Sequence, residues 1–379
     1  MIYTTLFTAA LAISGTAVAS PMNKHPWPPL PFSPHPNNPN NPNPNNPHVA
    51  FPPPPSAHPD PDAPTAHPDP STDPGVAPSN KHKDGLAQWA KRHGKYWGVA
   101  VDQGILQKPG WATFIAREFN QVTPENSMKW TETEPHKDQF KFDAADYVVD
   151  FAGKNNMKIR GHALVWHKQL PSYVTDIKDR KVLTEAIQSH IAKVVGRWKG
   201  QIQVWDVVNE IFEQDGSLRD SVFSRVLGED FVRIAFEAAH KADPEAKLYI
   251  NDFNLDDPNA PKTKAMIEKV AKWRQEGYPI SGIGSQSHIA PGGGHRHAAA
   301  LKALSAVVPE VAVTELDIPN APTEDYVAVV KGCLALENCV SLTSWGADDK
   351  VSWMPGKNAL LFDANFKPKK AYEAIMSTP

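Results

Sequence analysis

From about Leu86 onward, short apolar segments alternate with longer segments in which apolar residues recur every three or four positions. The short segments have the length of buried strands, and the longer ones place one apolar stripe on each helix. Strands that alternate with helices form βαβ units with parallel strands, and eight of them close a (β/α)8 TIM barrel. The predicted strands are Tyr96–Val101, Glu118–Val122, Lys158–Val165, Gln201–Val208, Lys247–Asn251, Gly282–Ser287, Val311–Glu315 and Val340–Trp345.

Helices are predicted in the amphipathic segments between these strands. Two of the segments begin at Pro261 and Pro368, and the first turn of a helix tolerates proline. Residues 102–113 show no clear pattern. The predicted helices are Asp143–Asn155, Thr184–Trp198, Glu229–Ala242, Pro261–Glu276, His295–Ala306, Thr323–Leu336 and Pro368–Ser377.

The first 80 residues differ in composition from the rest of the chain. Residues 1–19 form a short apolar run that ends in Ala17-Val18-Ala19, a pattern that predicts a signal peptide. More than half of the 37 prolines lie within residues 20–80, and this Pro/Asn-rich composition predicts a disordered linker. Residues 81–379 then form one barrel domain, and we expect a secreted, extracellular protein.

Composition excludes several classes of function. A net charge of −3 gives no basic surface for nucleic acid, and no apolar run is long enough to span a membrane. The two cysteines, Cys333 and Cys339, are expected to form a disulfide, with two buried free thiols as the alternative. The sequence His295-Arg296-His297 follows three glycines and is predicted to be a surface loop. Neither a metal nor a cofactor is predicted.

Polar side chains gather where the predicted strands end. One strand runs into Asn209 and Glu210, and another ends at Glu315 and Asp317. Because a strand buried on both faces should stay apolar to its last residue, these groups indicate a site at the carboxyl ends of the strands. Two carboxylic acids that meet there would be able to cleave a glycosidic bond.

Five longer motifs occur in order at the strand ends: Thr-Pro-Glu-Asn-Ser-Met-Lys-Trp (123–130), Arg-Gly-His-Ala-Leu-Val-Trp-His (160–167), Trp-Asp-Val-Val-Asn-Glu (205–210), Gly-Ile-Gly-Ser-Gln-Ser-His (282–288) and Val-Thr-Glu-Leu-Asp (313–317). With these motifs, the chain from Leu86 to its end resembles glycoside hydrolase family 10, the endo-β-1,4-xylanases. Two positions depart from the family pattern. Val351 stands where a polar residue is usual, and Met354 stands where Arg is common. Both departures concern fine specificity.

The resemblance implies roles for individual residues. Glu210 would be the acid/base of a retaining hydrolysis and Glu315 its nucleophile, with His288 orienting Glu315. Asp206 and Asp317 are expected to hold the surrounding network. Sugar contacts are implied for Glu125, Asn126, Lys129, His162, Trp166, Gln169, Asn209, Gln286, His288, Trp345 and Trp353.

The chemistry sets a condition on the two glutamates. Retaining enzymes hold the two carboxyl groups about 5–5.5 Å apart. A charged Glu315 is expected to raise the pKa of Glu210, which keeps it protonated until a sugar esterifies Glu315. A structural role is predicted for His167.

Two other functions stay open. The same fold and mechanism would serve another β-linked glycan or a plant glycoside, and a glycan-binding or wall-structural protein is a non-enzyme alternative. A binding protein need keep neither Glu210 nor Glu315, which favours an enzyme. The leading hypothesis is a monomeric, secreted endo-1,4-β-xylanase whose partner is xylan.

Overall fold

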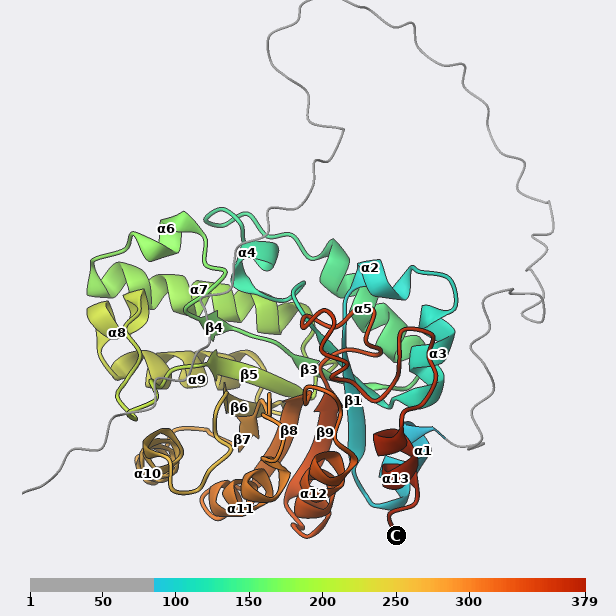
Figure 1. Cartoon of the computed structure of the whole chain (residues 1–379). Coiled ribbons are helices and arrows are strands. Elements are labelled where there is room, and N and C mark those ends of the chain that lie inside the picture. The colour runs from blue at the N-terminus through green and yellow to red at the C-terminus, as the bar shows by residue number, and fades with distance from the viewer. Residues whose placement is uncertain (1–84) are drawn as a thin grey trace, which may run out of the picture. The chain divides into compact units, whose positions relative to one another are not determined.

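A computed structural model describes residues 85–379, so the predicted signal peptide (1–19) and linker (20–80) lie outside the described residues. The described strands form one parallel sheet in the order β3-β2-β1-β9-β8-β7-β6-β5-β4 (Figure 1). A further pairing of β3 with β5 closes this sheet into a barrel. None of the helices between residues 85 and 379 has both the length and the apolar character needed to cross a bilayer.

The predicted eight-stranded barrel is confirmed, although it contains nine strand segments. β3 and β4 pair with the same strand, β5, through Arg160 opposite Val204 and Val165 opposite Val208. They are therefore two halves of one barrel position. The strands are β1 (Tyr96–Val101), β2 (Gln121–Pro124), β3 (Lys158–Gly161), β4 (Val165–Trp166), β5 (Val204–Asn209), β6 (Lys247–Asp252), β7 (Gly282–Ser285), β8 (Glu310–Leu316) and β9 (Cys339–Ser344).

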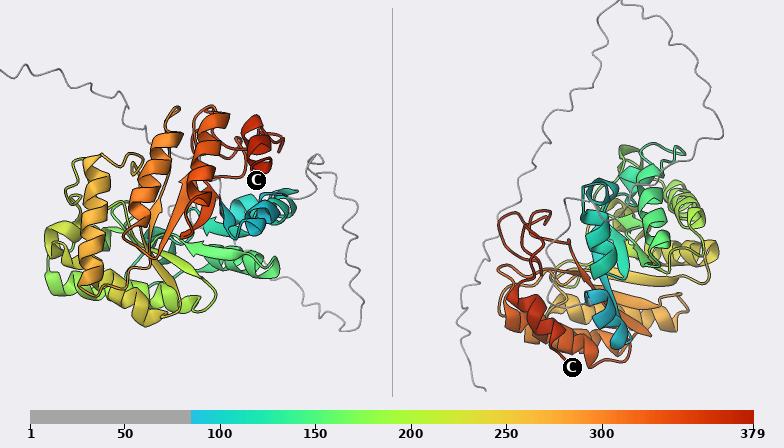
Figure 2. Two further views of the ribbon diagram at one scale, coloured as in Figure 1. Left: turned by 90° about the horizontal axis from the view of Figure 1, so that it is seen from below. Right: turned by 90° about the vertical axis from the view of Figure 1, so that its right-hand side faces the viewer.

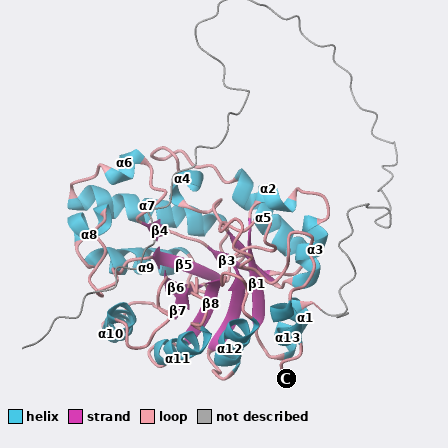
Figure 3. Cartoon of the chain, in the orientation of Figure 1, coloured by secondary structure: helices cyan, strands magenta, loops and turns pink. Residues whose placement is uncertain are grey.

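Helices surround the outer face of the barrel (Figures 2 and 3). Each of the seven predicted helices is present, with ends that differ by a few residues. The others are short or were not predicted. The helices are α1 (Leu86–Arg92), α2 (Gln103–Leu106), α3 (Trp111–Glu118), α4 (Trp130–Thr133), α5 (Asp143–Lys154), α6 (Ser172–Thr175), α7 (Arg180–Arg197), α8 (Val222–Leu227), α9 (Asp230–Ala242), α10 (Pro261–Gln275), α11 (Gly294–Ser305), α12 (Thr323–Leu334) and α13 (Lys370–Met376).

Two predictions about secondary structure are wrong. The second strand does not begin at Glu118, because that residue is the last of α3 and accepts a hydrogen bond from the Tyr372 hydroxyl (3.0 Å). Of the two predictions for His295-Arg296-His297, the helix from His295 is confirmed and the surface loop is wrong, because the segment lies in the first turn of α11. His297 is fully buried there, and its Nε2 lies 2.7 Å from the Ser287 hydroxyl.

The two faces of β5 explain how the barrel can hold polar groups. Trp205 points outward and packs near Trp198, with the ring centroids 6.3 Å apart. Gly161 on β3 makes room for this ring, because a Cβ there would lie 2.3 Å from it. The next residue, Asp206, points inward and accepts from Arg160. Alternation along one strand thus separates an apolar outer layer from a polar interior.

The predicted disulfide between Cys333 and Cys339 is confirmed. Cys333 lies in the last turn of α12, and Cys339 is the first residue of β9. The bond therefore fixes the turn that leads from α12 into the amino-terminal end of the barrel strand β9.

Replacing both cysteines with alanine should lower the free energy of unfolding by about 2 kcal/mol. Without the short cross-linked loop, the unfolded chain has more conformational entropy. Urea denaturation of the variant measures the change. Reductant should lower the stability of the wild-type protein and leave the variant unaffected. Equal stability of the two proteins in oxidising buffer would contradict this account.

Candidate active site

A network of amide side chains connects the two predicted glutamates. Asn251 Nδ2 at the end of β6 donates to Asn209 Oδ1 (3.0 Å) and to Glu315 Oε1 (2.9 Å). Gln286 Nε2, just after β7, donates to Asn209 Oδ1 and to Glu210 Oε1, both at 3.3 Å. Residues from four strand ends, far apart in sequence, therefore meet at one mouth of the barrel. The carboxyl groups of Glu210 and Glu315 both lie in this network.

The Glu315 carboxylate also faces a charged histidine. His288 Nε2 lies 3.1 Å from Glu315 Oε2, and Nδ1 lies 2.8 Å from Asp317 Oδ1. Burial favours the neutral ring, but the charge and hydrogen bonds of Asp317 and Glu315 outweigh it and raise the pKa of His288 to about 10. Both ring nitrogens then donate. The second oxygen of Asp317 accepts from Trp353 Nε1 at 2.6 Å.

The surroundings of Glu210 differ from the expectation. Burial by itself raises the pKa of this carboxyl. The Trp166 indole, the Lys168 ammonium, Gln286 and His167 together outweigh burial, so the pKa of Glu210 is lowered. The sequence predicts that Glu315 raises the pKa of Glu210 and keeps it protonated, whereas the net shift of this pKa is downward. The cause is the number of donors and cations around Glu210.

A buried ion cluster supports the site from below. Asp206 accepts from Arg160 Nε (3.2 Å) and lies 2.9 Å from His162 Nδ1. Burial opposes the Asp206 charge, but Arg160 and His162 outweigh it and lower the pKa of Asp206. The His162 ring meets the Trp345 ring edge to face, with centroids 5.4 Å apart. Asp206 thus fixes the orientation of His162.

The end of β2 adds a cation to the mouth. Lys129 Nζ donates to Asn126 Oδ1 (3.0 Å) and lies 4.8 Å from the centre of the Trp166 ring. Burial lowers the pKa of Lys129, while Glu315 is the charge that most opposes this shift. Burial, followed by the charge of Asp102, raises the pKa of Glu125. Lys129 therefore lies within electrostatic reach of Glu210 and Glu315.

Sequence reasoning missed two residues of this site. Asn251 is predicted only as the last residue of a strand, although it bridges Asn209 and Glu315. Asp102 follows β1 directly and accepts from the Asn126 main-chain N–H at 2.8 Å. The same strand-end signal would have identified both. Gln169 lies after β4, and the structure shows no side-chain hydrogen bond from it to another predicted site residue within residues 85–379.

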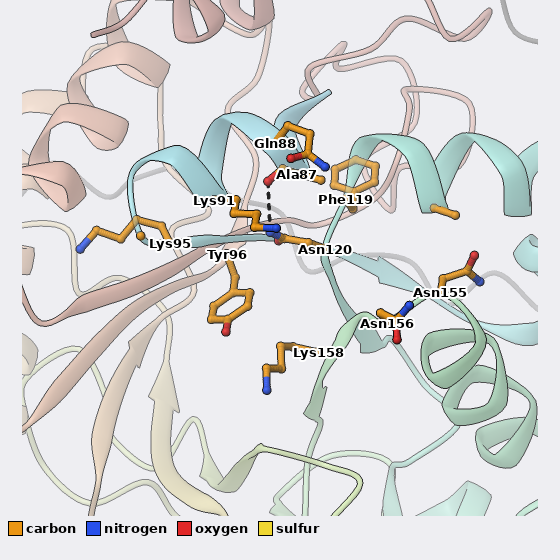
Figure 4. Close-up of a pocket in the computed structure, with 12 residues that line it drawn as sticks. Ala87, Gln88, Lys91, Lys95, Tyr96, Phe119, Asn120, Asn155, Asn156 and Lys158 are labelled. Carbon is orange, nitrogen blue, oxygen red and sulfur yellow. Dashed lines mark hydrogen bonds between the residues drawn. The ribbon is translucent and has the colours of Figure 1, made fainter. Parts of the chain in front are cut away.

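A separate hollow of about 530 Å³ lies at the other end of the barrel (Figure 4). Tyr96 and Lys158, the first residues of β1 and β3, line it together with Lys91 and Asn120. None of the predicted site residues contributes to it. Barrel enzymes carry their chemistry at the carboxyl ends of the strands, so we place no activity in this hollow. Within residues 85–379, no three side chains of His, Cys, Asp or Glu are grouped to hold a metal ion.

Comparison with known proteins identifies the family. The model of Glycosyl hydrolase family 10 matches residues 85–378. Endo-1,4-beta-xylanase 2 of Claviceps purpurea is 62% identical over 293 residues, which cover 77% of this chain and 90% of that protein. Endo-1,4-beta-xylanase 3 of Hypocrea jecorina is 53% identical over 293 residues, covering 77% and 84%. A crystal structure of xylanase 10B from Thermotoga petrophila in complex with xylobiose matches with a TM-score of 0.73 and 32% identity, covering 78% of this chain and 97% of that one. The chain therefore belongs to glycosyl hydrolase family 10.

Proposed function

We propose that this glycoside hydrolase is an endo-1,4-β-xylanase that cleaves internal bonds of xylan with retention of configuration. The observation that carries the proposal is the shared amide network, in which Asn251 and Gln286 connect the carboxyl groups of Glu315 and Glu210. The names of the Claviceps and Hypocrea relatives support the substrate, as does the xylobiose complex of the Thermotoga protein.

In the first step, Glu315 is the nucleophile. One of its carboxylate oxygens forms a bond to the anomeric carbon while the bond from that carbon to the leaving oxygen breaks. Glu210 gives its proton to the leaving oxygen. Asn251 and His288 each hold one oxygen of Glu315, so the carboxylate cannot rotate freely away from the sugar.

In the second step, water replaces the enzyme at the anomeric carbon. Glu210 takes a proton from this water, the new carbon–oxygen bond forms, and the ester to Glu315 breaks. The lowered pKa of Glu210 suits this role as a base. A sugar that covers the site would remove water from Glu210 and raise its pKa, which suits the preceding role as an acid.

An unused donor beside Glu210 supports sugar binding. Asn209 Nδ2 is buried and has no hydrogen-bond partner among the described residues. A buried donor without a partner is costly, and a sugar hydroxyl oxygen would satisfy it. We assign Asn209 to the 2-hydroxyl of the sugar whose bond is cleaved. The flat faces of Trp345 and Trp353 would cover sugar rings, and Trp353 is 44% exposed.

The remaining parts of the proposal concern the whole chain. We assign residues 1–19 to a signal peptide, 20–80 to a linker and 81–379 to the catalytic domain of a monomeric, secreted enzyme. The disulfide supports an oxidising destination, because such bonds persist outside the cytosol.

The substitution Glu315→Gln should abolish hydrolysis of xylan, because the amide cannot form the glycosyl ester. Release of reducing sugar measures activity, and circular dichroism with thermal unfolding checks the fold. The matched control is Glu310→Gln at the opposite end of β8, where Glu310 accepts from the Tyr249 hydroxyl (2.7 Å). The control should keep its activity. Near-normal activity of Glu315→Gln, or a first product of inverted configuration, would refute the mechanism.

Rates on xylan, an aryl cellobioside and a saponin test the substrate. We expect the highest kcat/KM on xylan, because the proposal assigns the site to xylose units. A preference for the cellobioside or the saponin would keep the fold and the two-step chemistry and replace xylan as the substrate.

The histidines provide a pH test. With a pKa raised from 6.5 to about 10, His288 should stay charged between about pH 5 and pH 8. Its contribution to stability is then complete below pH 6.5 and is lost as the pH rises through 10. Burial lowers the pKa of His297 to about 4, so this ring should stay neutral over the same range. Nitrogen-15 NMR, assigned with His288→Gln and His297→Gln, distinguishes the two states. Titration of His288 near pH 6.5 would contradict the ion-pair arrangement.

A further inference from the structure

The geometry points to Arg219 as a positioning residue that holds the main chain of Glu210 in the conformation required for proton transfer. This inference rests on the proposed role of Glu210 as acid/base. Arg219 lies in the loop between β5 and α8, outside the five sequence motifs that indicated the site.

The backbone of Glu210 has a conformation that needs support. Its φ is 55°, in the left-handed region that residues with a side chain rarely adopt. Such a conformation persists only where neighbouring groups hold it, and it is frequent at functional sites. The groups that bind the peptide units on both sides of Glu210 therefore determine where its carboxyl group points.

Arg219 binds the segment from Glu210 to Phe212 through main-chain carbonyl groups. Its Nε donates to the Glu210 carbonyl oxygen at 2.7 Å, and its Nη2 donates to the Phe212 carbonyl oxygen at 2.9 Å. The third nitrogen, Nη1, lies 3.1 Å from Glu213 Oε1, and the side chain is 15% exposed. The planar guanidinium presents these donors at fixed angles, which one ammonium group cannot reproduce.

The opposite side of the segment is bound to the sheet. The Glu210 N–H donates to the Asn251 carbonyl oxygen (2.9 Å), and the Phe212 N–H donates to Asp252 Oδ2 (3.2 Å). The cavity next to Glu210 has a volume of only about 10 Å³, and Arg219 is among the residues that line it. The segment is thus held by its N–H groups from the sheet and by its carbonyl groups from Arg219.

Loss of Arg219 should affect proton transfer and leave nucleophilic attack intact. Without the two carbonyl contacts, the Glu210 peptide can relax from the left-handed conformation, and its carboxyl group would move relative to Gln286. Glu315 is held by Asn251 and His288, and neither of these side chains contacts Arg219. If only proton donation by Glu210 is impaired, the loss of rate depends on how much the leaving group needs a proton.

The experiment measures kcat/KM of Arg219→Met and Arg219→Lys on β-xylobiosides with different leaving groups. For phenyl xylobioside, whose leaving oxygen needs protonation, we expect a loss on the order of 10²-fold. For dinitrophenyl xylobioside, which departs without a proton, we expect kcat/KM close to that of the wild type. Arg219→Lys should behave like Arg219→Met, because the lysine keeps the charge and cannot bind both carbonyl oxygens.

Two further variants complete the design. Arg274→Met is the matched control, because Arg274 Nη1 also donates to a main-chain carbonyl, that of Val307 at 2.7 Å, in a part of the chain outside the site. It should show no dependence on the leaving group. Glu210→Ala, measured in parallel, should show the strongest dependence.

The outcomes are distinguishable. An equal loss on both substrates, no loss on either, or full rescue by Arg219→Lys would overturn the positioning role while Glu210→Ala still supports the proposed function. Absence of a leaving-group effect in Glu210→Ala itself would overturn the acid/base assignment and this inference with it. If Arg219→Met does not fold, the lysine variant decides between the same results.

Discussion

The site depends on one side chain, the amide of Asn251. Its Oδ1 accepts from the Thr314 hydroxyl at 2.6 Å, which turns Nδ2 toward Asn209 and Glu315. The amide fits only because its neighbour on β7 is Gly284, where a Cβ would lie 2.3 Å from Asn251 Oδ1. Three adjacent strands thus fix the orientation of one amide. The Asn251 amide thereby sets the position of Glu315, the proposed nucleophile, relative to Asn209, which precedes the proposed acid.

The charges of the barrel mouth are arranged in pairs around this amide. Arg160 faces Asp206, Lys262 Nζ lies 2.7 Å from Asp252 Oδ1, and His288 lies between Glu315 and Asp317. A buried charge is tolerated when an opposite charge and hydrogen bonds compensate its loss of water. Pairing therefore allows a barrel interior to hold several carboxylates without forcing them all to bind protons. It also connects Glu315, through His288 and Asp317, to the exposed ring of Trp353.

Much of the fold was predictable from periodicity, and the failures have physical causes. Eight apolar segments with parallel connections predict a closed barrel. The first of these predicted strands, Tyr96–Val101, has the bounds that β1 has in the structure. The start of β2 was misplaced because the residues around Glu118 do not mark the end of a helix. Glu118 is buried and is the last residue of α3. His297 was assigned to the surface because the glycines before it predict a loop. Its ring is instead buried and lies 2.7 Å from the hydroxyl of Ser287, in the segment that follows β7.

The sequence by itself determined the alternation of strands and helices in a barrel, the mouth of the barrel at which the polar groups gather, a preference for a disulfide over two free thiols, and the resemblance to the family. These properties follow from local patterns, because apolar period, strand-end polarity and cysteine spacing each involve neighbouring residues. The tertiary structure decided that Asn251 bridges Asn209 and Glu315, that Arg219 binds the main chain of Glu210, and that the pKa of Glu210 is lowered. Each of these depends on distances between groups brought together by strand register and loop paths. Electrostatic and hydrogen-bond energies change over fractions of an ångström, and the spacing of residues along the chain does not specify such distances.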